Sequence, residues 1–333
     1  MMSVLKKGFV VVTVLTLMGI LGISGVQQAS AAWPEKPITL YIPFAAGGTM
    51  DSSVRALAPG MEKALGQQIV LINKTGGGGT VALGILAGMK PDGYTLSGGT
   101  TSGVFRAPIL RKVPYKPLAS FTNIMAYANV SSGIVVKADG PFKTWQDLID
   151  YARQNPGKVK YSTTGSGSPM HVAMEFAAAV NGIKWIHIPY KGSMPALTAV
   201  LGGHVEACAA GPEFLNMVRS GQMRALAVIT QERMAEVPDV PTMIELGVDY
   251  INDTFFVIFA PAGLDPAITK KLEDAIAYAV DTPIYKDMAE KFAIVPMKMR
   301  SKEITKVLED GWPKQIKIFQ DLGRIKEPAT PPR

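Results

Sequence analysis

Residues 41–51 read YIPFAAGGTMD, an apolar run that reaches two glycines and then turns polar. A short apolar run bounded by small residues is typical of a buried strand, and the apolar spacing from Val54 to Leu65 is typical of an amphipathic helix. Backbone N–H groups at the start of such a helix attract anions. The stretch therefore predicts a strand, a small-residue turn and a helix start suited to a phosphate or a carboxylate.

Short apolar runs alternate with helix-like patterns over most of the chain. This alternation predicts an α/β fold with mostly parallel sheets and helices on both faces. Pro59-Gly60 is expected to kink the first helix or to end it early. A second unit of the same kind begins near Gly133, and no flexible tether precedes it, which indicates two lobes joined by more than one crossing of the chain.

The first 31 residues are expected to be an export signal rather than part of the fold. The basic pair Lys6-Lys7 precedes an apolar run from Phe9 to about Val26, and Ala29-Ser30-Ala31 has the small-x-small pattern that a signal peptidase reads. We expect cleavage near Ala31 and a mature protein in the periplasm.

Charge and cysteine content narrow the classes of function. The formal net charge is +7, but the basic residues are scattered and no basic stripe with interleaved aromatic residues indicates nucleic-acid binding. Cys208 is the only cysteine, so no internal disulfide can form. The three histidines, His171, His187 and His204, lack the spacing of metal ligands, and no metal site is predicted.

A glycine run at residues 76–79 matches a dinucleotide fingerprint in part. Gly77, Gly79 and Ala82 have the G-x-G-x-x-A spacing. That fingerprint also needs an acidic residue at the end of the next strand, which here reads Ser97-Gly98-Gly99-Thr100. We therefore expect no cofactor, and we interpret the run as a loop that lets two backbones approach closely.

Signatures of hydrolases and kinases are missing from the sequence. Ser102, Ser166, Ser168 and Ser193 lie near glycines but lack the G-x-S-x-G spacing of a nucleophile elbow, and no glycine loop ends as a P-loop does. We expect a binding protein rather than an enzyme. An exported NAD-dependent enzyme is the alternative that the glycine run leaves open.

A strand, a small-residue loop and a helix start recur at residues 44–49, 163–169 and 190–193. Each loop offers N–H groups at the positive end of a helix dipole. Ser168 before Pro169 also has the pattern of a simple N-cap, so capping is the alternative to ligand binding there. Three such loops, divided between two units, favour one shared cleft at the ends of the strands.

Five segments, in the order in which they occur, carry a family resemblance. They are WPEKPITLYIPFAAGGTMD at 33–51, KPDGYTL at 90–96, IPYKGSMPALTAVLGGHVE at 188–206, VPDVPTMIELGV at 237–248 and APAGLDP at 260–266. Together they resemble the substrate-binding proteins of tripartite tricarboxylate transporters, also called Bug receptors. The resemblance implies a periplasmic binding protein of type II, the Venus-flytrap class, with lobe 1 at residues 32–131 and 251–333 and lobe 2 at residues 132–250.

The resemblance also implies which residues contact the ligand. In lobe 1, the family's contact loops correspond to Phe44, Ala45, Ala46, Gly47, Gly48 and Thr49, with Asp51 at the helix start, and to Thr100, Thr101 and Ser102. In lobe 2, the contact loop corresponds to Thr164, Gly165, Ser166, Gly167, Ser168 and His171. Lys191 and Glu213 are two further candidates, and the sequence leaves open which of them faces the ligand. Family members commonly carry an acidic or amide residue where this chain reads Ala209-Ala210-Gly211-Pro212-Glu213, so the distal ligand contact is expected to differ.

The function implied is that of a monomeric receptor that captures a small di- or tricarboxylate or aromatic acid and passes it to membrane permease subunits. A sensory receptor of the same fold that signals to a membrane kinase is an alternative. We expect the ligand carboxylate against Ala46–Thr49, with Ser166 and Ser168 gripping it from the other lobe, so that the lobes close only around a ligand. The sequence does not determine which carboxylate binds.

Overall fold

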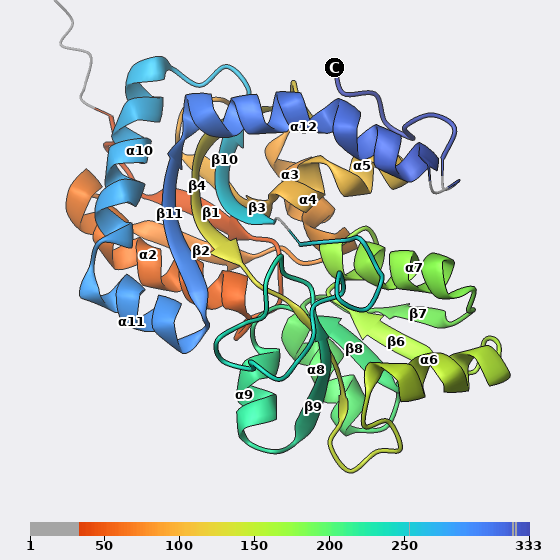
Figure 1. Cartoon of the computed structure of the whole chain (residues 1–333). Coiled ribbons are helices and arrows are strands. Elements are labelled where there is room, and N and C mark those ends of the chain that lie inside the picture. Colours follow the sequence, from red (N-terminus) through yellow and green to blue (C-terminus); the bar gives the residue numbers. More distant parts are fainter. Residues whose placement is uncertain (1–32, 253, 322, 324) are drawn as a thin grey trace, which may run out of the picture. The chain divides into compact units, whose positions relative to one another are not determined.

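The computed structural model describes residues 33–252, 254–321, 323 and 325–333, so the predicted signal peptide at residues 1–31 lies outside the described residues. Residues 36–333 form a unit of their own, which contains two β-sheets with helices packed against them (Figure 1). No helix among the described residues has the length and apolar character needed to cross a membrane. The two sheets define the two lobes of an α/β fold.

Lobe 1 is built on a six-stranded sheet with the strand order β11-β4-β10-β3-β1-β2. The strands are β1 (Ile38–Ile42), β2 (Ile69–Asn73), β3 (Thr95–Thr100), β4 (Phe121–Val130), β10 (Phe255–Pro261) and β11 (Ile294–Arg300). β1 pairs in parallel with β2 and β3, whereas β10 is antiparallel to β3 and β4, and β11 is antiparallel to β4. The sheet is therefore mixed rather than mostly parallel, because β4 and β10 carry the chain out of the lobe and back in opposite directions.

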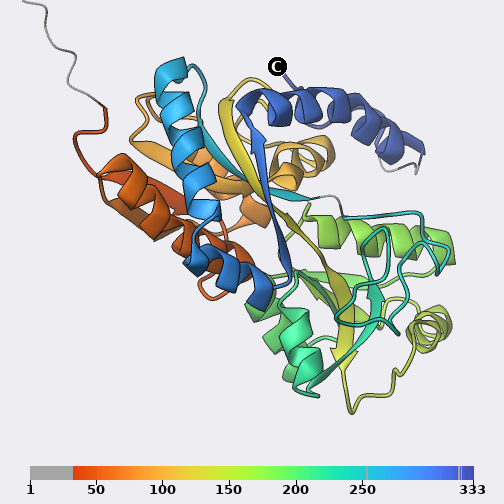
Figure 2. The same cartoon turned by 60° about the vertical axis from the view of Figure 1, so that its left-hand side comes forward.

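Helices cover both faces of this sheet (Figures 1 and 2). One face holds α2 (Thr49–Leu65), α10 (Pro266–Val280) and α11 (Pro283–Lys291); the other holds α3 (Thr80–Leu86), α4 (Thr101–Val104), α5 (Arg106–Leu110) and α12 (Ser301–Asp321). The early end predicted for the first helix is not observed, since α2 continues through Pro59 to Leu65. Gly60 lies so close to α10 that a Cβ there would come within 2.6 Å of the Ala279 Cα, and this packing supports the helix past the proline.

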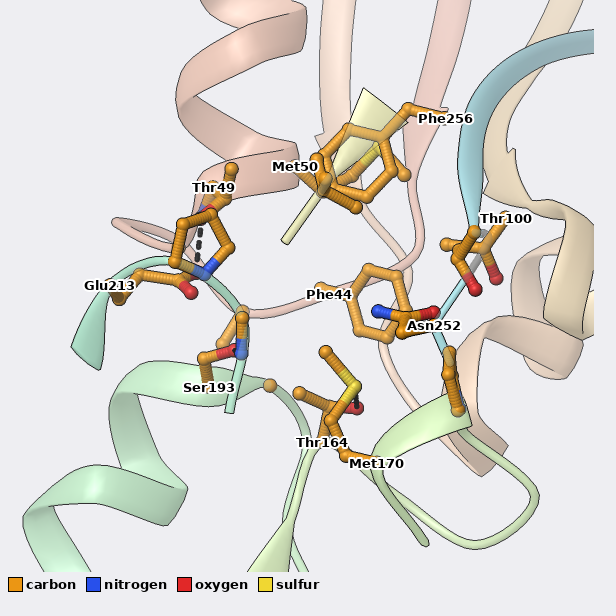
Figure 3. A pocket seen from close by; sticks show the side chains of 18 residues that line it. Phe44, Thr49, Met50, Thr100, Thr164, Met170, Ser193, Glu213, Asn252 and Phe256 are labelled. Atoms are coloured by element: carbon orange, nitrogen blue, oxygen red, sulfur yellow. Dashed lines mark hydrogen bonds between the residues drawn. The ribbon is translucent and has the colours of Figure 1, made fainter. Parts of the chain in front are cut away.

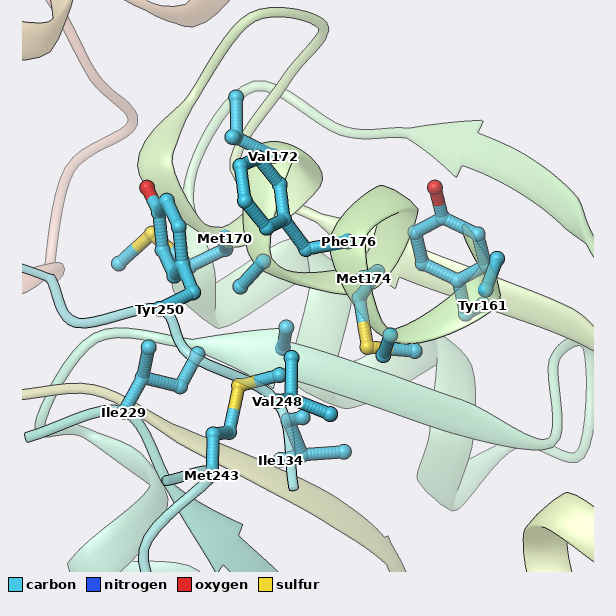
Figure 4. Close-up of a cluster of buried hydrophobic side chains, with 14 of the residues drawn as sticks. Ile134, Tyr161, Met170, Val172, Met174, Phe176, Ile229, Met243, Val248 and Tyr250 are labelled. Atoms are coloured by element: carbon cyan, nitrogen blue, oxygen red, sulfur yellow. The ribbon is translucent and has the colours of Figure 1, made fainter. Parts of the chain in front are cut away.

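Lobe 2 is built on a five-stranded mixed sheet with the order β7-β6-β8-β5-β9. Its elements are β5 (Gly133–Lys137), α6 (Trp145–Gln154), β6 (Lys160–Thr163), α7 (Pro169–Asn181), β7 (Ile186–Pro189), α8 (Ser193–Leu201), β8 (Ala207–Ala210), α9 (Phe214–Arg219) and β9 (Met223–Val228). Alternate residues of β5 face opposite sides: Ile134 packs under α7 with Met174 and Phe176 (Figure 4), and Val135 packs on the other face with Leu197. Both faces of this sheet are therefore buried.

The chain passes between the lobes at two places. It leaves lobe 1 at the end of β4 and enters β5 at Gly133, and it returns to β10 after β9. Asn252, on the return, donates its backbone N–H to the Ile229 carbonyl at 2.9 Å and its side-chain amide to the Ser132 hydroxyl at 3.0 Å. Because Ser132 lies on the outward crossing, the side-chain bond ties the two crossings to each other, so the lobes are joined by a paired connection rather than by a single linker.

Candidate functional site

A cavity lies between the lobes where their loops meet (Figure 3). Residues from lobe 1 and the crossings that line it are Phe44, Ala45, Gly48, Thr49, Met50, Thr100, Val130, Asn252, Thr254 and Phe256; those from lobe 2 are Thr164, Pro169, Met170, Gly192, Ser193, Gly211, Pro212 and Glu213. The free volume of the cavity, including its open mouth, is about 500 Å³. The cavity therefore has room for a small organic molecule.

The structure divides the predicted contact residues into two groups. Those that line the cavity are Phe44, Ala45, Gly48, Thr49, Thr100, Thr164 and Glu213. Those that lie outside its lining are Ala46, Gly47, Asp51, Thr101, Ser102, Gly165, Ser166, Gly167, Ser168, His171 and Lys191. Lys191 is exposed and Glu213 is buried, and of these two candidates only Glu213 lines the cavity.

Asp51 is buried but turned toward its own loop. Its Oδ2 accepts bonds from the Gly47 backbone N–H and from Arg55 Nε, both at 3.0 Å, and its Oδ1 accepts one from Asn73 Nδ2 at 2.9 Å. Burial alone would raise the pKa of this carboxyl, but the bonds from Arg55, Asn73 and Gly47 outweigh burial and hold the pKa below its usual range. Asp51 therefore fixes the glycine loop at the start of α2.

The side chain of Glu213, a residue of lobe 2, makes a hydrogen bond with lobe 1. The residue precedes α9 but does not cap that helix; its Oε1 instead accepts the backbone N–H of Thr49, the first residue of α2, at 2.5 Å. Two glycines make room for the carboxylate. A Cβ on Gly48 would lie 3.3 Å from Oε1, and one on Gly211 would lie 2.7 Å from Oε2. The helix start that we expected to hold a ligand carboxylate thus donates its first N–H group to a carboxylate of the protein.

The second oxygen of Glu213 has no partner among the described residues, although the residue is only 3% exposed. Glu213 is also the only ionisable side chain among the lining residues given above. A buried carboxylate oxygen without a donor is unfavourable, and such exceptions need an explanation. Glu213 Oε2 is therefore a buried hydrogen-bond acceptor that has no donor among the described residues.

The opposite end of the cavity presents hydroxyl groups. Figure 3 places Thr100 and Asn252 across from Glu213 and Thr49, with the ring of Phe44 between the two ends. The Thr100 hydroxyl accepts the Gly103 N–H at 3.2 Å, and the Thr254 hydroxyl accepts from Arg106 Nη1 at 3.2 Å. Each of these hydroxyls can still donate its own proton.

Glycines bring the lobes together beside the cavity. A Cβ on Gly165 of lobe 2 would lie 2.7 Å from the Gly78 nitrogen of lobe 1, and one on Gly167 would lie 3.1 Å from the Ala107 Cβ. Ser102 Oγ donates to the Gly167 carbonyl at 3.1 Å across the same contact. The interpretation of the glycine run at 76–79 as a loop for close backbone approach is confirmed.

Ser168 and His171 support this contact from within lobe 2. Ser168 Oγ accepts the His171 backbone N–H at 3.2 Å as the N-cap of α7, and His171 Nδ1 accepts the Gly167 N–H at 3.1 Å. The His171 ring stacks on His187 with 4.1 Å between ring centroids. Burial, with a smaller effect of His171, lowers the pKa of His187 to about 3. No group of three possible metal ligands gathers in the part of the chain that the structure describes.

Sequence reasoning missed several lining residues. Gly192 and Ser193 belong to the third strand–loop–helix unit, in which we selected Lys191, and this loop lines the cavity through the two residues that follow the lysine. Asn252 and Thr254 lie on the return crossing, which carries no recognisable motif, and Phe256 lies in β10. Met170, in the first turn of α7, is another apolar lining residue that was not predicted.

Comparisons with known proteins agree with this geometry. Residues 53–324 match the family described as tripartite tricarboxylate transporter family receptor. The chain is 37% identical over 300 residues to the UPF0065 protein in the gbd 5' region of Cupriavidus necator, which covers 90% of this chain and 91% of the relative. The solved structure of the periplasmic binding protein BugD has a TM-score of 0.82 at 28% identity and covers 87% of this chain and 99% of BugD. A protein of R. palustris solved with adipate has a TM-score of 0.80, also at 28% identity, over 87% of this chain and 98% of that protein.

Proposed function

The chain belongs to the tripartite tricarboxylate transporter receptor family, and we propose that it is a monomeric periplasmic receptor that binds a small organic acid between its lobes and delivers it to membrane permease subunits. The lobes divide near residues 131 and 251 in this proposal. The observation that carries it is the composition of the cavity wall, to which both lobes contribute. A ligand in contact with both lobes stabilises the closed arrangement over the open one, and a permease can distinguish the two.

The chemistry of the cavity supports an organic acid with an apolar body. Phe44, Met50, Met170 and Phe256 supply apolar walls, and the hydroxyls of Thr100 and Thr254 can donate to a carboxylate. A relative from R. palustris was solved with adipate. The receptor has no chemistry of its own in this proposal, and binding and release are its whole function.

Thermal unfolding tests the binding half of the proposal. The protein is purified, freed of carried-over ligand by unfolding and refolding, and heated with dicarboxylates, tricarboxylates, aromatic acids and amino acids in turn, with NAD as the control. A ligand at about one hundred times its Kd adds roughly 2.7 kcal/mol to the free energy of unfolding. A clear rise in Tm with one class of acid is expected. A rise with NAD alone would contradict the proposal.

Uptake tests the delivery half. Cells with and without the gene are given the same labelled acid, and loss of uptake that returns with the gene is expected. If cells without the gene take up at the normal rate an acid that the purified protein binds, the receptor does not deliver that acid to a permease, and the delivery half of the proposal is wrong.

A further inference from the structure

The unpartnered oxygen of Glu213 restricts what can bind beside it. Glu213 lines the cavity, is 3% exposed, and uses Oε1 for the Thr49 N–H, while Oε2 has no partner among the described residues. A carboxylate only accepts hydrogen bonds. A bound molecule satisfies Oε2 only if it donates, and burial makes that requirement costly to ignore.

A second carboxylate at this end is disfavoured for two reasons. The Thr49 N–H, which would otherwise hold an anion at the start of α2, already donates to Glu213. A ligand carboxylate would also lie beside the Glu213 carboxylate, and like charges in a shared buried site repel each other. None of the other lining side chains is a lysine, arginine or histidine that could offset this repulsion.

The far end of the cavity, across from Glu213, offers hydrogen-bond donors. Thr100 and Thr254 each accept a hydrogen bond from the protein and keep a hydroxyl proton to donate. Asn252 does not discriminate, because its Ser132 partner can either donate or accept and so either end of the amide can face the ligand. The Thr49 hydroxyl does not discriminate either, since it can donate or accept. Glu213 is thus the lining residue that only accepts hydrogen bonds. The hydroxyls that accept one bond and can donate another are Thr100 and Thr254 at the far end and Ser193, which accepts the Gly211 N–H at 3.1 Å on the Glu213 side (Figure 3).

We infer that the ligand is an acid that carries a nitrogen donor, an ammonium or an amide N–H, at the end opposite its carboxylate. The nitrogen donates to Glu213 Oε2, the carboxylate accepts from Thr100 and Thr254, and the apolar chain lies along Phe44. This inference rests on the proposed function and names the class of acid within it. A plain dicarboxylate such as adipate, found with the R. palustris relative, fits only one end of this cavity.

Calorimetric titration of matched ligands tests the inference. For chains of three to six carbons, the dicarboxylate, its monoamide and the ω-amino acid of equal length are titrated into the ligand-free protein. The ω-amino acid or the monoamide is expected to bind about tenfold or more tightly than the dicarboxylate of the same length, the scale of a hydrogen bond to a charged group. This titration uses the unmodified protein, so its result does not depend on whether a variant folds.

Glu213→Gln then identifies the residue responsible. The amide keeps an oxygen for the Thr49 N–H but loses the charge, so the ω-amino acid should lose about tenfold or more in affinity, and the gap to the dicarboxylate should close or reverse. Glu236→Gln, at an exposed glutamate of the same lobe, should change neither affinity. Dicarboxylates that bind the unmodified protein as tightly as the matched nitrogen-bearing acids would overturn the inference and leave the proposed function intact. Absence of binding by every acid in the series would overturn both.

Discussion

The carboxylate of Glu213 in lobe 2 lies 2.5 Å from the backbone nitrogen of Thr49, the first residue of helix α2 in lobe 1. A residue that precedes one helix therefore caps another helix across the interlobe cavity. The N-cap position of α2 itself is Gly48, which has no side chain to do so. The bond joins the two cavity walls and leaves the second oxygen of Glu213 without a partner among the described residues.

Glu213→Ala should favour the open arrangement of the lobes. A hydrogen bond to a charged group contributes about 1.5–3 kcal/mol, or roughly a 10- to 150-fold change in the balance between closed and open forms. Small-angle X-ray scattering of the ligand-free protein should give a larger radius of gyration for this variant than for the unmodified chain. Glu236→Ala, which removes an exposed acid, serves as the control. Superimposable scattering curves would show that the bond does not hold the lobes.

Gly167→Ala should weaken ligand binding by hindering closure. Gly167 has a φ of +79° and faces Ala107 of lobe 1, where a Cβ would lie 3.1 Å from the alanine Cβ. Gly157 has a φ of +73° and no atom within 4 Å of the corresponding Cβ position, so Gly157→Ala carries similar backbone strain without the interlobe contact. Both variants should lose about 1–3 kcal/mol of unfolding free energy. Only Gly167→Ala should lose affinity in calorimetric titration, and equal affinities for the two variants would contradict the closure argument.

Ser168→Ala should lower stability and leave ligand affinity unchanged. We expected a ligand contact from the sequence, but the Ser168 hydroxyl accepts the His171 N–H at the start of α7 and does not line the cavity. Loss of an N-cap costs about 1 kcal/mol, measurable by urea unfolding. Thr144→Ala removes the N-cap of α6 and gives a matched loss away from the cavity. A tenfold fall in affinity for Ser168→Ala alone would restore the contact role.

His187 should make the protein less stable as the pH falls below about 6.5. Its folded pKa is about 3 and its ordinary value is 6.5, so between these limits the unfolded chain takes up a proton that the folded chain does not. The stabilising effect is complete above pH 6.5 and declines toward pH 3. His187→Phe keeps a ring to stack between Tyr161 and His171 but cannot titrate. Urea unfolding from pH 8 to pH 5 should show a shallower decline for this variant, and parallel curves would exclude His187 as the cause.

Local signals in the sequence were sufficient for much of the fold. The stretch at residues 41–51 contains the end of β1 at Ile42 and the start of α2 at Thr49, as its pattern predicted. β4 and β11 were not recognised, because β11 is an edge strand with Pro296 and mostly exposed residues, and β4 has no regular alternation of polar and apolar residues. Their antiparallel pairing depends on partners far away in the sequence, so the mixed character of the sheet could not be deduced from neighbouring residues.

The sequence by itself determined where strands end in small-residue loops and helices begin, because strands, caps and turns depend on residues a few positions apart. Only the tertiary structure decided which groups of these loops enter the cavity between the lobes. Lys191 and Glu213 each follow a strand of the same sheet, yet Lys191 points to solvent and Glu213 reaches Thr49. Neighbouring residues of a loop can point in opposite directions, so the loop sequence does not specify which side chain enters the cavity. Glu213 reaches Thr49 because Gly48 and Gly211 leave space for its carboxylate where the lobes meet.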